Sequence, residues 1–189
     1  MPIKPSLIVD KELVLKPLNL DCLEDMIEAF YEGPESAFAA APWLEIERDV
    51  KPQFVEFLLE VLPLTDIGEI FHWQINERSS GNFVGLIGLD KVTQTAIGYW
   101  NMGFWIRPKM QRKKVVSRSI DCILDWLKEN RDFRIVEMTV SIENVASRNT
   151  VKSAIKRWKL DEFNFHETFL SIRNKPVKHE TYLFDLRSD

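Results

Sequence analysis

One stretch, residues 103–119, constrains this chain most, because it places a strand, a basic turn and a helix in direct succession. Pro108 ends the strand just after Ile106, since proline cannot donate to a sheet ladder. The basic turn at 111–114 follows, and a helix begins after it. Helix N-termini carry free N–H groups and the positive end of the helix dipole. The stretch therefore predicts an anion site, with a solvated basic turn as the simpler alternative.

The composition predicts a folded chain without a global affinity for polyanions. Of 189 residues, 45% are hydrophobic and 11% aromatic, which excludes a disordered chain. The net charge of −4 gives no case for nucleic acid or a membrane surface, so any anion site must be local. No apolar run approaches the roughly 18 residues of a membrane span, and the N-terminus lacks the apolar core of a signal peptide. Cys22 and Cys122 do not make a disulfide framework, so we expect reduced thiols and a cytoplasmic protein. The length predicts one domain over residues 1–189.

Hydrophobic periodicity and breaking residues predict the order β-α-α-β-β-β-α-β-α-β-β. The strands at 70–76, 83–92 and 96–106 are joined by hairpin-length turns and should form an antiparallel meander. The helix after the basic turn should then cross over to a parallel strand at 135–142. This order predicts an α+β fold with a mixed, mostly antiparallel sheet flanked by helices. The other expected strands are 12–18, 163–172 and 180–186.

Capping and breaking residues set the expected helix bounds. Asp21 is the expected cap of the first helix, and Gly33 and Pro34 end it. An apolar linker at 37–43 leads to a second helix that begins near Pro52 and ends at Pro63. The last helix is expected at 144–158.

Three short motifs occur in the same order as these elements. The first is G-F-W-I-R-P at 103–108, the second is Q-R-K-K-V-V-S-R-S-I at 111–120, and the third is N-V-A-S at 144–147. A late H-E pair lies at 179–180, before the last strand. Each motif is short, but their order and spacing together are fairly specific.

With the element order, these motifs resemble the GNAT acyltransferases, in particular the RimJ/RimL-like branch that acetylates protein N-termini. That family has G-Y-W-I-x-P at the end of its fourth strand, N-x-x-S after its fifth, and H-D before the final strand. Its turn motif is Q-G-x-G-x-x-[ST]-[EQ]-[AS]-[LI], which this chain matches at Gln111, Ser117, Ser119 and Ile120. The resemblance covers nearly the whole chain in element order and implies the GNAT fold.

The resemblance also implies acetyl-CoA as cosubstrate. In the family, backbone N–H groups of the turn cradle the coenzyme A pyrophosphate, and the pantetheine arm lies between two parted strands. By this resemblance the coenzyme-binding residues are the following: Trp105, Ile106, Gln111, Arg112, Lys113, Lys114, Val115, Val116, Ser117 and Asn144.

Arg112 and Lys114 occupy the two positions at which the family has glycine. Glycine allows close approach of the backbone to the phosphates. Two accounts of the replacement stay open. The cationic side chains replace N–H contacts by charge-assisted contacts, or the coenzyme site has decayed and the fold serves a non-catalytic binding role.

The resemblance implies Ser147 as general acid toward the leaving thiolate and Asn144 as a hydrogen-bonding residue at the strand gap. Both are equally well explained as helix-capping residues. A general base must take a proton from the attacking ammonium. Glu167 is the expected base, with Glu143 and Glu69 as alternatives, and a solvated surface role is the alternative for each.

The interpretation that follows is an acetyl-CoA-dependent N-acetyltransferase in which an amine attacks the thioester directly. The acceptor is a protein N-terminus or a small amine, and the oxyanion is met by backbone N–H groups near the strand gap. The competing hypothesis is a non-catalytic GNAT-like binding protein with a degenerate coenzyme site. The three histidines lack metal-ligand spacing, so no metal is expected. Neither nucleic acid nor a membrane is an expected partner, and a homodimer is left open.

Overall fold

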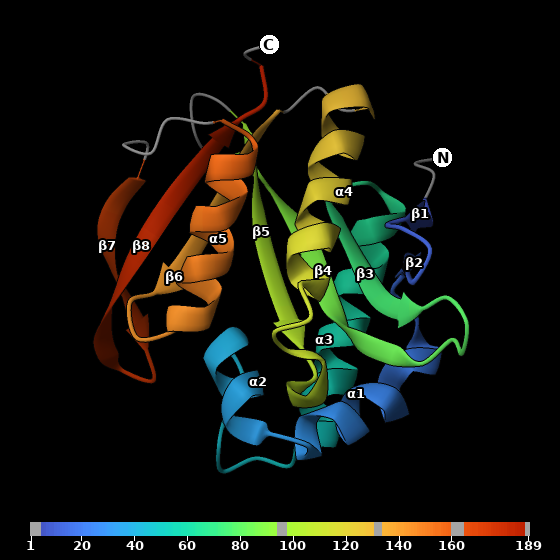
Figure 1. Cartoon of the computed structure of the whole chain (residues 1–189). Coiled ribbons are helices and arrows are strands. Elements are labelled where there is room, and N and C mark those ends of the chain that lie inside the picture. The colour runs from blue at the N-terminus through green and yellow to red at the C-terminus, as the bar shows by residue number, and fades with distance from the viewer. Residues whose placement is uncertain (1–4, 94–97, 131–133, 160–164, 188–189) are drawn as a thin grey trace.

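Eight strands form one sheet in the order β1-β2-β3-β4-β5-β6-β8-β7 (Figure 1). The computed structural model describes residues 5–93, 98–130, 134–159 and 165–187. The strands are β1 (Leu7–Ile8), β2 (Leu13–Pro17), β3 (Ile70–Glu77), β4 (Phe83–Val92), β5 (Tyr99–Ile106), β6 (Ile135–Ser141), β7 (Phe165–Ile172) and β8 (Lys175–Asp185).

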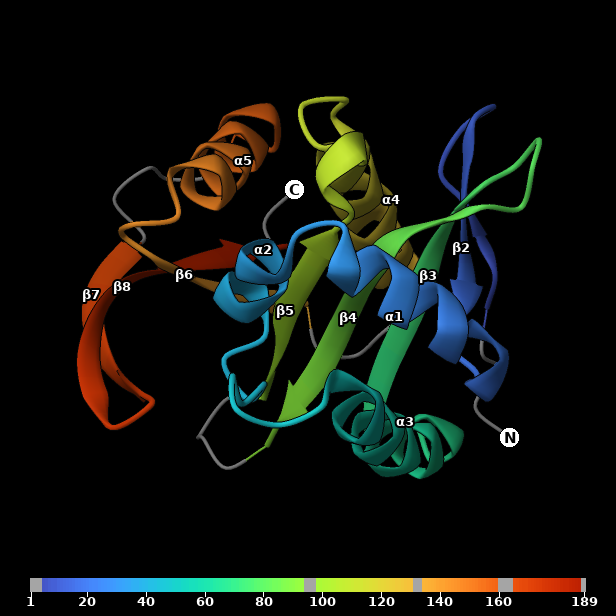
Figure 2. The same ribbon diagram turned by 90° about the horizontal axis from the view of Figure 1, so that it is seen from below.

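Helices cover both faces of this sheet. Figure 2 shows α4 and α5 on one side and α1, α2 and α3 on the other, and we call these the α4–α5 face and the α1–α3 face. The helices are α1 (Leu23–Tyr31), α2 (Pro34–Ala40), α3 (Val50–Asp66), α4 (Val115–Asn130) and α5 (Val145–Arg157), with short 3-10 turns η1 (Leu20–Cys22) and η2 (Pro108–Met110).

Strand pairing confirms the predicted α+β class. All neighbouring strands in the sheet are antiparallel except β5 and β6, which pair in parallel across the α4 crossover. The meander β3-β4-β5 is confirmed, and β8 lies between β6 and β7.

The alternation of side chains along the strands separates two cores. Trp100 and Met102 of β5 point into the core under α4 and α5, whereas Trp105 points into the core under α1, α2 and α3. In β6, Val136 and Met138 join the first core, so the residues between them face the other side. Polar residues of β6 therefore lie on the α1–α3 face.

Three details of the N-terminal third differ from the sequence prediction. Residues 34–40 of the expected turn and linker form α2, with Pro34 in its first turn. The second helix continues past Pro63 to Asp66, because proline removes one backbone hydrogen bond but the turn stays packed and Thr65 donates to the Val61 carbonyl. Asp21 does not cap α1, whose N-cap is Cys22 without a side-chain cap bond, whereas Asn19 caps the preceding η1 and accepts from the Asp21 N–H.

Candidate functional site

The parallel ladder between β5 and β6 is short. It contains two residue pairs, Trp100 with Val136 and Asn101 with Glu137. On their other edges, β5 stays paired with β4 to Ile106, and β6 stays paired with β8 to Ser141. The two strands therefore part beyond Asn101, and Figure 1 shows them diverging toward the basic turn. We call this parting the strand fork.

Backbone groups of β5 face the strand fork at alternate residues. The Arg107 N–H donates to the Val84 carbonyl oxygen at 3.0 Å, which fixes the phase of the β4–β5 ladder. In an antiparallel pair the hydrogen-bonding direction alternates from residue to residue. The N–H and C=O groups of Met102, Phe104 and Ile106 therefore point toward β6, where an extended ligand can pair with them.

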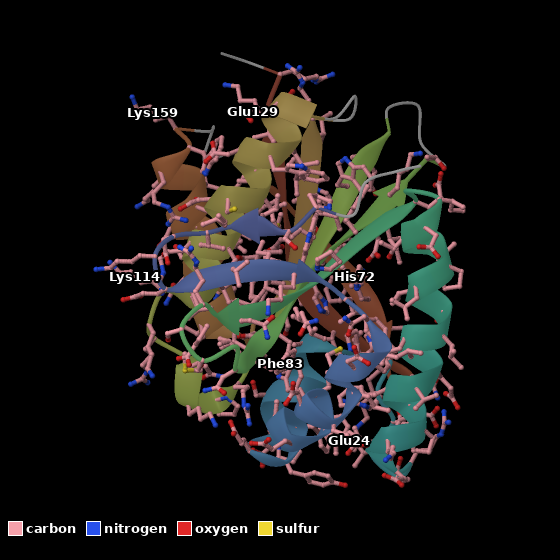
Figure 3. The ribbon with its side chains drawn as sticks, turned by 90° about the vertical axis from the view of Figure 1, so that its right-hand side faces the viewer. Glu24, His72, Phe83, Lys114, Glu129 and Lys159 are labelled. Atoms are coloured by element: carbon pink, nitrogen blue, oxygen red, sulfur yellow. The ribbon has the colours of Figure 1, made fainter. Side chains whose placement is uncertain are left out.

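The basic turn keeps a backbone shape that glycine favours. Arg112 and Lys114 have φ angles of 62° and 57°, in the left-handed region. This conformation costs a residue with a side chain roughly 1–2 kcal/mol. These are the two positions at which the resemblance expects glycine, so cationic side chains here occupy a backbone conformation that glycine adopts without strain. Both side chains are exposed, and Figure 3 shows Lys114 extending away from the protein.

Helix α4 begins directly after this turn. The N–H of Arg118 donates to the Lys114 carbonyl, so the N–H groups of Val115, Val116 and Ser117 precede the first helical bond. Arg118 also pairs with Asp10 at 2.6 Å, which holds the first turn of α4 against the N-terminal hairpin. The result is a fixed helix N-terminus beside a cationic turn, an arrangement that favours anions.

The residues before the basic turn are attached to α1. The Arg107 guanidinium is buried, and its Nη2 lies 2.6 Å from Glu28 and 2.5 Å from Glu32. Lys109 also pairs with Glu32 at 2.7 Å. Hydrogen bonds from Arg107 and Lys109 lower the pKa of the Glu32 carboxyl below its usual value, so Glu32 is ionised at neutral pH. These ion pairs fix the position of α1 relative to the turn.

The same segment is attached to α2. The side-chain amide of Gln111 donates to the Ser36 hydroxyl at 3.1 Å. A Cβ at Gly33 would lie 2.6 Å from the Pro108 ring, so only glycine allows this approach. Gln111 therefore connects the turn to α2 with its side chain and does not direct it toward the strand fork.

Asn144 and Ser147 meet at the N-terminus of α5. Asn144 is the N-cap, and its Oδ1 accepts from the Ser147 N–H at 3.1 Å. The capping role of Asn144 is thus confirmed. In the part of the chain that the structure describes, the Ser147 hydroxyl makes no hydrogen bond and is half-buried.

A buried carboxylate fixes α5 to β8. Arg148 donates to both oxygens of Glu180, with distances of 2.6 and 3.0 Å, and the Tyr182 hydroxyl donates to the same carboxylate. Chiefly through the Arg148 hydrogen bond, the pKa of Glu180 falls to about 2, although burial opposes this. Burial and the adjacent Glu180 carboxylate raise the pKa of Tyr182. The Ser147 end of α5 is therefore held firmly next to the strand fork.

The expected general base and its alternatives lie in different places. Glu167 is exposed, forms an ion pair with Lys178 at 2.7 Å, and is directly across from Glu180. Because cross-strand neighbours share a face, Glu167 lies on the α4–α5 face. Glu143 is exposed just before α5, and Glu69 pairs with Lys91 at 3.1 Å.

Trp105 and Ile106 differ in their relation to the strand fork. The Trp105 side chain is buried in the core under α1, α2 and α3, and its backbone belongs to the β4 side of the ladder. The Ile106 backbone faces the strand fork. Of the ten residues expected to bind the coenzyme, Ile106 lies at the strand fork, residues 111–117 form the turn and the first turn of α4, and Asn144 caps α5.

Sequence reasoning missed a polar group at the closed end of the strand fork. Glu137 pairs with Asn101 in the last ladder pair and is half-buried. Tyr99 of β5 and Thr139 of β6 lie beside it on the same face of the sheet. The signal was present, because alternation places a lone glutamate on the polar side of strand 135–142. The sequence does not show where two strands part, so it cannot assign Glu137 to the end of a fork.

No helix in the described ranges is long and apolar enough to cross a membrane. Within those same ranges, no group of three or more His, Cys, Asp or Glu side chains is arranged to hold a metal ion.

Comparison with protein families matches residues 12–154 to the family described as "Acetyltransferase (GNAT) domain". This match covers most of the chain and includes the strand fork, the basic turn and Ser147. Comparison with curated proteins found no match.

Several solved structures share the whole fold at low sequence identity. RimL, the ribosomal L7/L12 alpha-N-protein acetyltransferase in complex with coenzyme A, has a TM-score of 0.80 at 11% identity, over 98% of this chain and 100% of its own. The ribosomal-protein-S5-alanine acetyltransferase from Vibrio fischeri has a TM-score of 0.76 at 12% identity, over 97% and 98%. The microcin C7 self-immunity acetyltransferase MccE, with acetyl-CoA and AMP, has a TM-score of 0.77 at 14% identity, over 97% and 98%.

Proposed function

The chain belongs to the GNAT acetyltransferase family and is an acetyl-CoA-dependent N-acetyltransferase, and we propose that its acceptor is the free N-terminus of a protein or peptide. Residues 1–189 act as one acetyltransferase domain in this proposal. The observation that carries it is the strand fork, which opens onto a cationic turn and the N-terminus of α4.

The described residues fit the coenzyme in two respects. Left-handed Arg112 and Lys114 keep the turn in a shape that glycine would adopt, so the N–H groups that follow remain available to a diphosphate. The unpaired edges of β5 and β6 offer backbone donors and acceptors to an extended pantetheine arm. Arg112, Lys113 and Lys114 add positive charge at the surface, which supports the account in which charge replaces glycine.

Ser147 is proposed to protonate the leaving thiolate. Its hydroxyl makes no hydrogen bond within the described residues, which leaves it free to donate, and its N–H is held by the Asn144 cap. The Arg148–Glu180 pair fixes this end of α5 to β8. A donor in a fixed position beside the strand fork suits general acid catalysis, because the proton donor must first lie within hydrogen-bonding reach of the leaving group.

An N-terminal acceptor is supported by the way the β7–β8 turn approaches the segment after α2. Arg173 in that turn donates to the Leu44 carbonyl at 3.2 Å, and its guanidinium lies 5.3 Å from the centre of the Phe38 ring. This contact crosses the α1–α3 face beside the strand fork. A single chain end passes such a crossing more easily than a folded surface that carries an internal lysine.

The proposal is tested with acetyl-CoA and matched peptides. Calorimetry should detect acetyl-CoA binding, and mass spectrometry should find acetylation of a peptide with a free N-terminus. The same peptide with a blocked N-terminus and one internal lysine should stay unmodified, and spermidine serves as the small-amine comparison. Preferential acetylation of spermidine would contradict the N-terminal acceptor, while absence of acetyl-CoA binding would contradict the function as a whole.

We further propose a cytoplasmic location and leave self-association to measurement. Cys22 and Cys122 are free thiols, which supports a reducing compartment. Burial raises the pKa of each to about 11, so native labelling by a thiol reagent should be slow and unfolding should reveal two thiols. β7 is an outer strand of the sheet and carries an exposed Phe169, so a homodimer through this edge is the arrangement to test by light scattering.

A further inference from the structure

Glu137 lies where the two strands of the fork separate. It forms the last ladder pair with Asn101, and beyond this pair β5 and β6 diverge. The segment from Asn101 to Ile106 extends roughly 17 Å, at about 3.3–3.4 Å per residue. An arm that starts at the basic turn and runs along this edge therefore has its far end beside Glu137.

The side chain of Glu137 lies on the α1–α3 face. Val136 and Met138 on either side of it are buried under α4 and α5, so Glu137 points the other way. Glu167 lies on the α4–α5 face with Glu180. Glu137 is thus separated by the sheet from Glu167, and the two carboxylates cannot serve the same position.

Two hydroxyl-bearing residues lie beside the carboxylate of Glu137. Tyr99 of β5 and Thr139 of β6 share its face of the sheet, and both lower the pKa of its carboxyl. Thr139 in turn shares a hydrogen bond of 2.9 Å with Thr181 of β8. Side chains from three strands therefore surround the closed end of the fork on this face.

Burial dominates the protonation of this group. It raises the pKa of the Glu137 carboxyl, while His166 of β7, Tyr99 and Thr139 lower it by smaller amounts. The group across the ladder on β8 is Leu183, which carries no charge. Glu137 is therefore a stronger proton acceptor than a solvated glutamate.

Space for a ligand lies next to it. Gly103 is two residues beyond Asn101 on β5 and is exposed on the same face as Trp105. A Cβ built on Gly103 would meet no atom within 4 Å. The α1–α3 face is therefore open beside the closed end of the fork, and an acceptor can approach from this side.

We propose that Glu137 is the catalytic base that accepts a proton from the acceptor ammonium, with Tyr99 and Thr139 as positioning residues. The inference rests on the proposed function and deepens it. It replaces Glu167 in the role of base and assigns the acceptor to the α1–α3 face, opposite α4 and α5.

The proton balance of the reaction is complete with these groups. The acceptor arrives as R–NH3⁺ and gives one proton to the Glu137 carboxylate. The nitrogen lone pair then forms the C–N bond with the thioester carbon, and the C–S bond breaks with its electron pair on sulfur. The thiolate gains one proton from Ser147, and the second proton that the nitrogen loses as the amide forms returns through solvent to restore the Ser147 hydroxyl. Glu137 releases its proton to solvent, so the net products are amide, coenzyme A thiol and H⁺.

The first test is the pH dependence of kcat/KM for a peptide with an N-terminal alanine. In the wild type the rate should rise through the pKa of Glu137. In Glu137→Gln only the free amine reacts, so the rise should move to the amine pKa of about 7.7–8.0. Below that pH the variant should lose roughly 10²–10⁴-fold in rate, with acetyl-CoA affinity unchanged. Glu60→Gln, an exposed change on α3, is the control for loss of a surface carboxylate.

Tyr99→Phe separates positioning from structure. It removes a hydroxyl that lowers the pKa of the Glu137 carboxyl, so the rise in the pH profile should move to higher pH while its height is largely kept. A wild-type pH profile in Glu137→Gln would overturn the proposal. The proposal would also be overturned if Glu167→Gln, rather than Glu137→Gln, lost activity on the acidic side of the pH profile. That result would place the base on the α4–α5 face.

A second measurement needs neither acceptor nor coenzyme. In protein labelled with ¹³C at the glutamate carboxyl, one resonance should titrate above the others and be absent from the spectrum of Glu137→Gln. No such resonance would overturn the assignment of Glu137 as a base. Because this titration is read without acetyl-CoA, its failure is distinguishable from a failure of the proposed function.

Discussion

Nη2 of Arg107 donates to Oε1 of Glu32 at 2.5 Å, and this contact joins the residue before η2 to the C-terminal cap of α1. The guanidinium is buried, whereas Glu32 keeps partial contact with solvent. The backbone N–H of the same residue donates to β4. Arg107 therefore sets where the basic turn begins relative to both the sheet and α1.

Arg107→Met should lower stability and weaken acetyl-CoA binding together. The loss of stability is expected at roughly 1.5–3 kcal/mol, the range for a hydrogen bond to a charged group, because Glu28 and Glu32 can still be hydrated. Thermal unfolding and calorimetry measure the two effects. Arg48→Met is the matched control, since Arg48 also bridges two glutamates but lies at the surface and away from the turn. Equal losses of stability and acetyl-CoA affinity in both variants would show that Arg107 contributes no more than a surface arginine does.

The double change Arg112→Gly and Lys114→Gly should weaken acetyl-CoA binding without lowering stability. Glycine removes the left-handed penalty of roughly 1–2 kcal/mol per residue, and its extra freedom in the unfolded chain offsets about 0.5–1 kcal/mol of that gain. Binding should lose roughly 1.5–3 kcal/mol per charge-assisted hydrogen bond and become less sensitive to salt, because exposed charges are screened over about 8 Å.

Lys159→Gly is the control for this double change. Lys159 also has a left-handed backbone, with a φ of 52°, and Figure 3 shows it well separated from Lys114. Its acetyl-CoA affinity should match the wild type, as read by calorimetry at two salt concentrations. Tighter binding by the double variant would mean that the side chains only obstruct the turn. Binding by neither protein would favour the non-catalytic alternative.

Ser147→Ala should reduce turnover by at least about 10²-fold with little change in acetyl-CoA affinity. The Asn144 cap bonds the backbone N–H of Ser147, which alanine keeps, so the stability of α5 should be unchanged. Asn144→Ala is the opposite case and should cost about 0.5–2 kcal/mol through loss of the cap. Steady-state kinetics and thermal unfolding of both variants separate the roles. Full turnover in Ser147→Ala would leave this serine as a first-turn residue only.

The Glu180 carboxylate should make the free energy of unfolding depend on pH in the acidic range. Its folded pKa of about 2 lies below the ordinary value of 4.5, so the unfolded chain binds the proton more readily. The stabilisation is therefore complete above pH 4.5 and is lost as the pH falls toward 2. The difference in unfolding free energy between wild type and Glu180→Gln should shrink over that window in denaturant titrations. A difference that stays constant with pH would contradict an ionised Glu180 in the folded state.

The sequence predicted the elements around the site because local signals mark them. Pro108 and the basic turn separate β5 from α4, and Asn144 begins α5. Helix α2 lies where the sequence predicts a turn and a linker. Gly33 and Pro34 are suited to a helix N-terminus, but the small apolar residues after them are also typical of a linker. Pro63 predicts a helix end, but one missing hydrogen bond does not end a helix whose other face is buried.

The closed end of the strand fork is beyond such local signals. Strands at 99–106 and 135–141 have regular patterns along their full lengths, and only their pairing shows that they part after Asn101 and Glu137. The role expected of Glu167 rests on the assumption that its strand passes the acceptor site, and it stays a prediction to be tested against Glu137. Periodicity reports which face a side chain takes, whereas the neighbour across a parallel ladder depends on the whole fold.

The strand fork also divides the sheet into two parts. The N-terminal part, β1 to β5, and the C-terminal part, β6 with β8 and β7, share two ladder pairs. A donor molecule that lies along both edges acts as a removable strand, and its binding free energy adds to the cohesion of the two parts. Without acetyl-CoA the protein lacks this ligand-linked stabilisation and should unfold more readily. The concentration of substrate would then affect the stability of this enzyme as well as its rate.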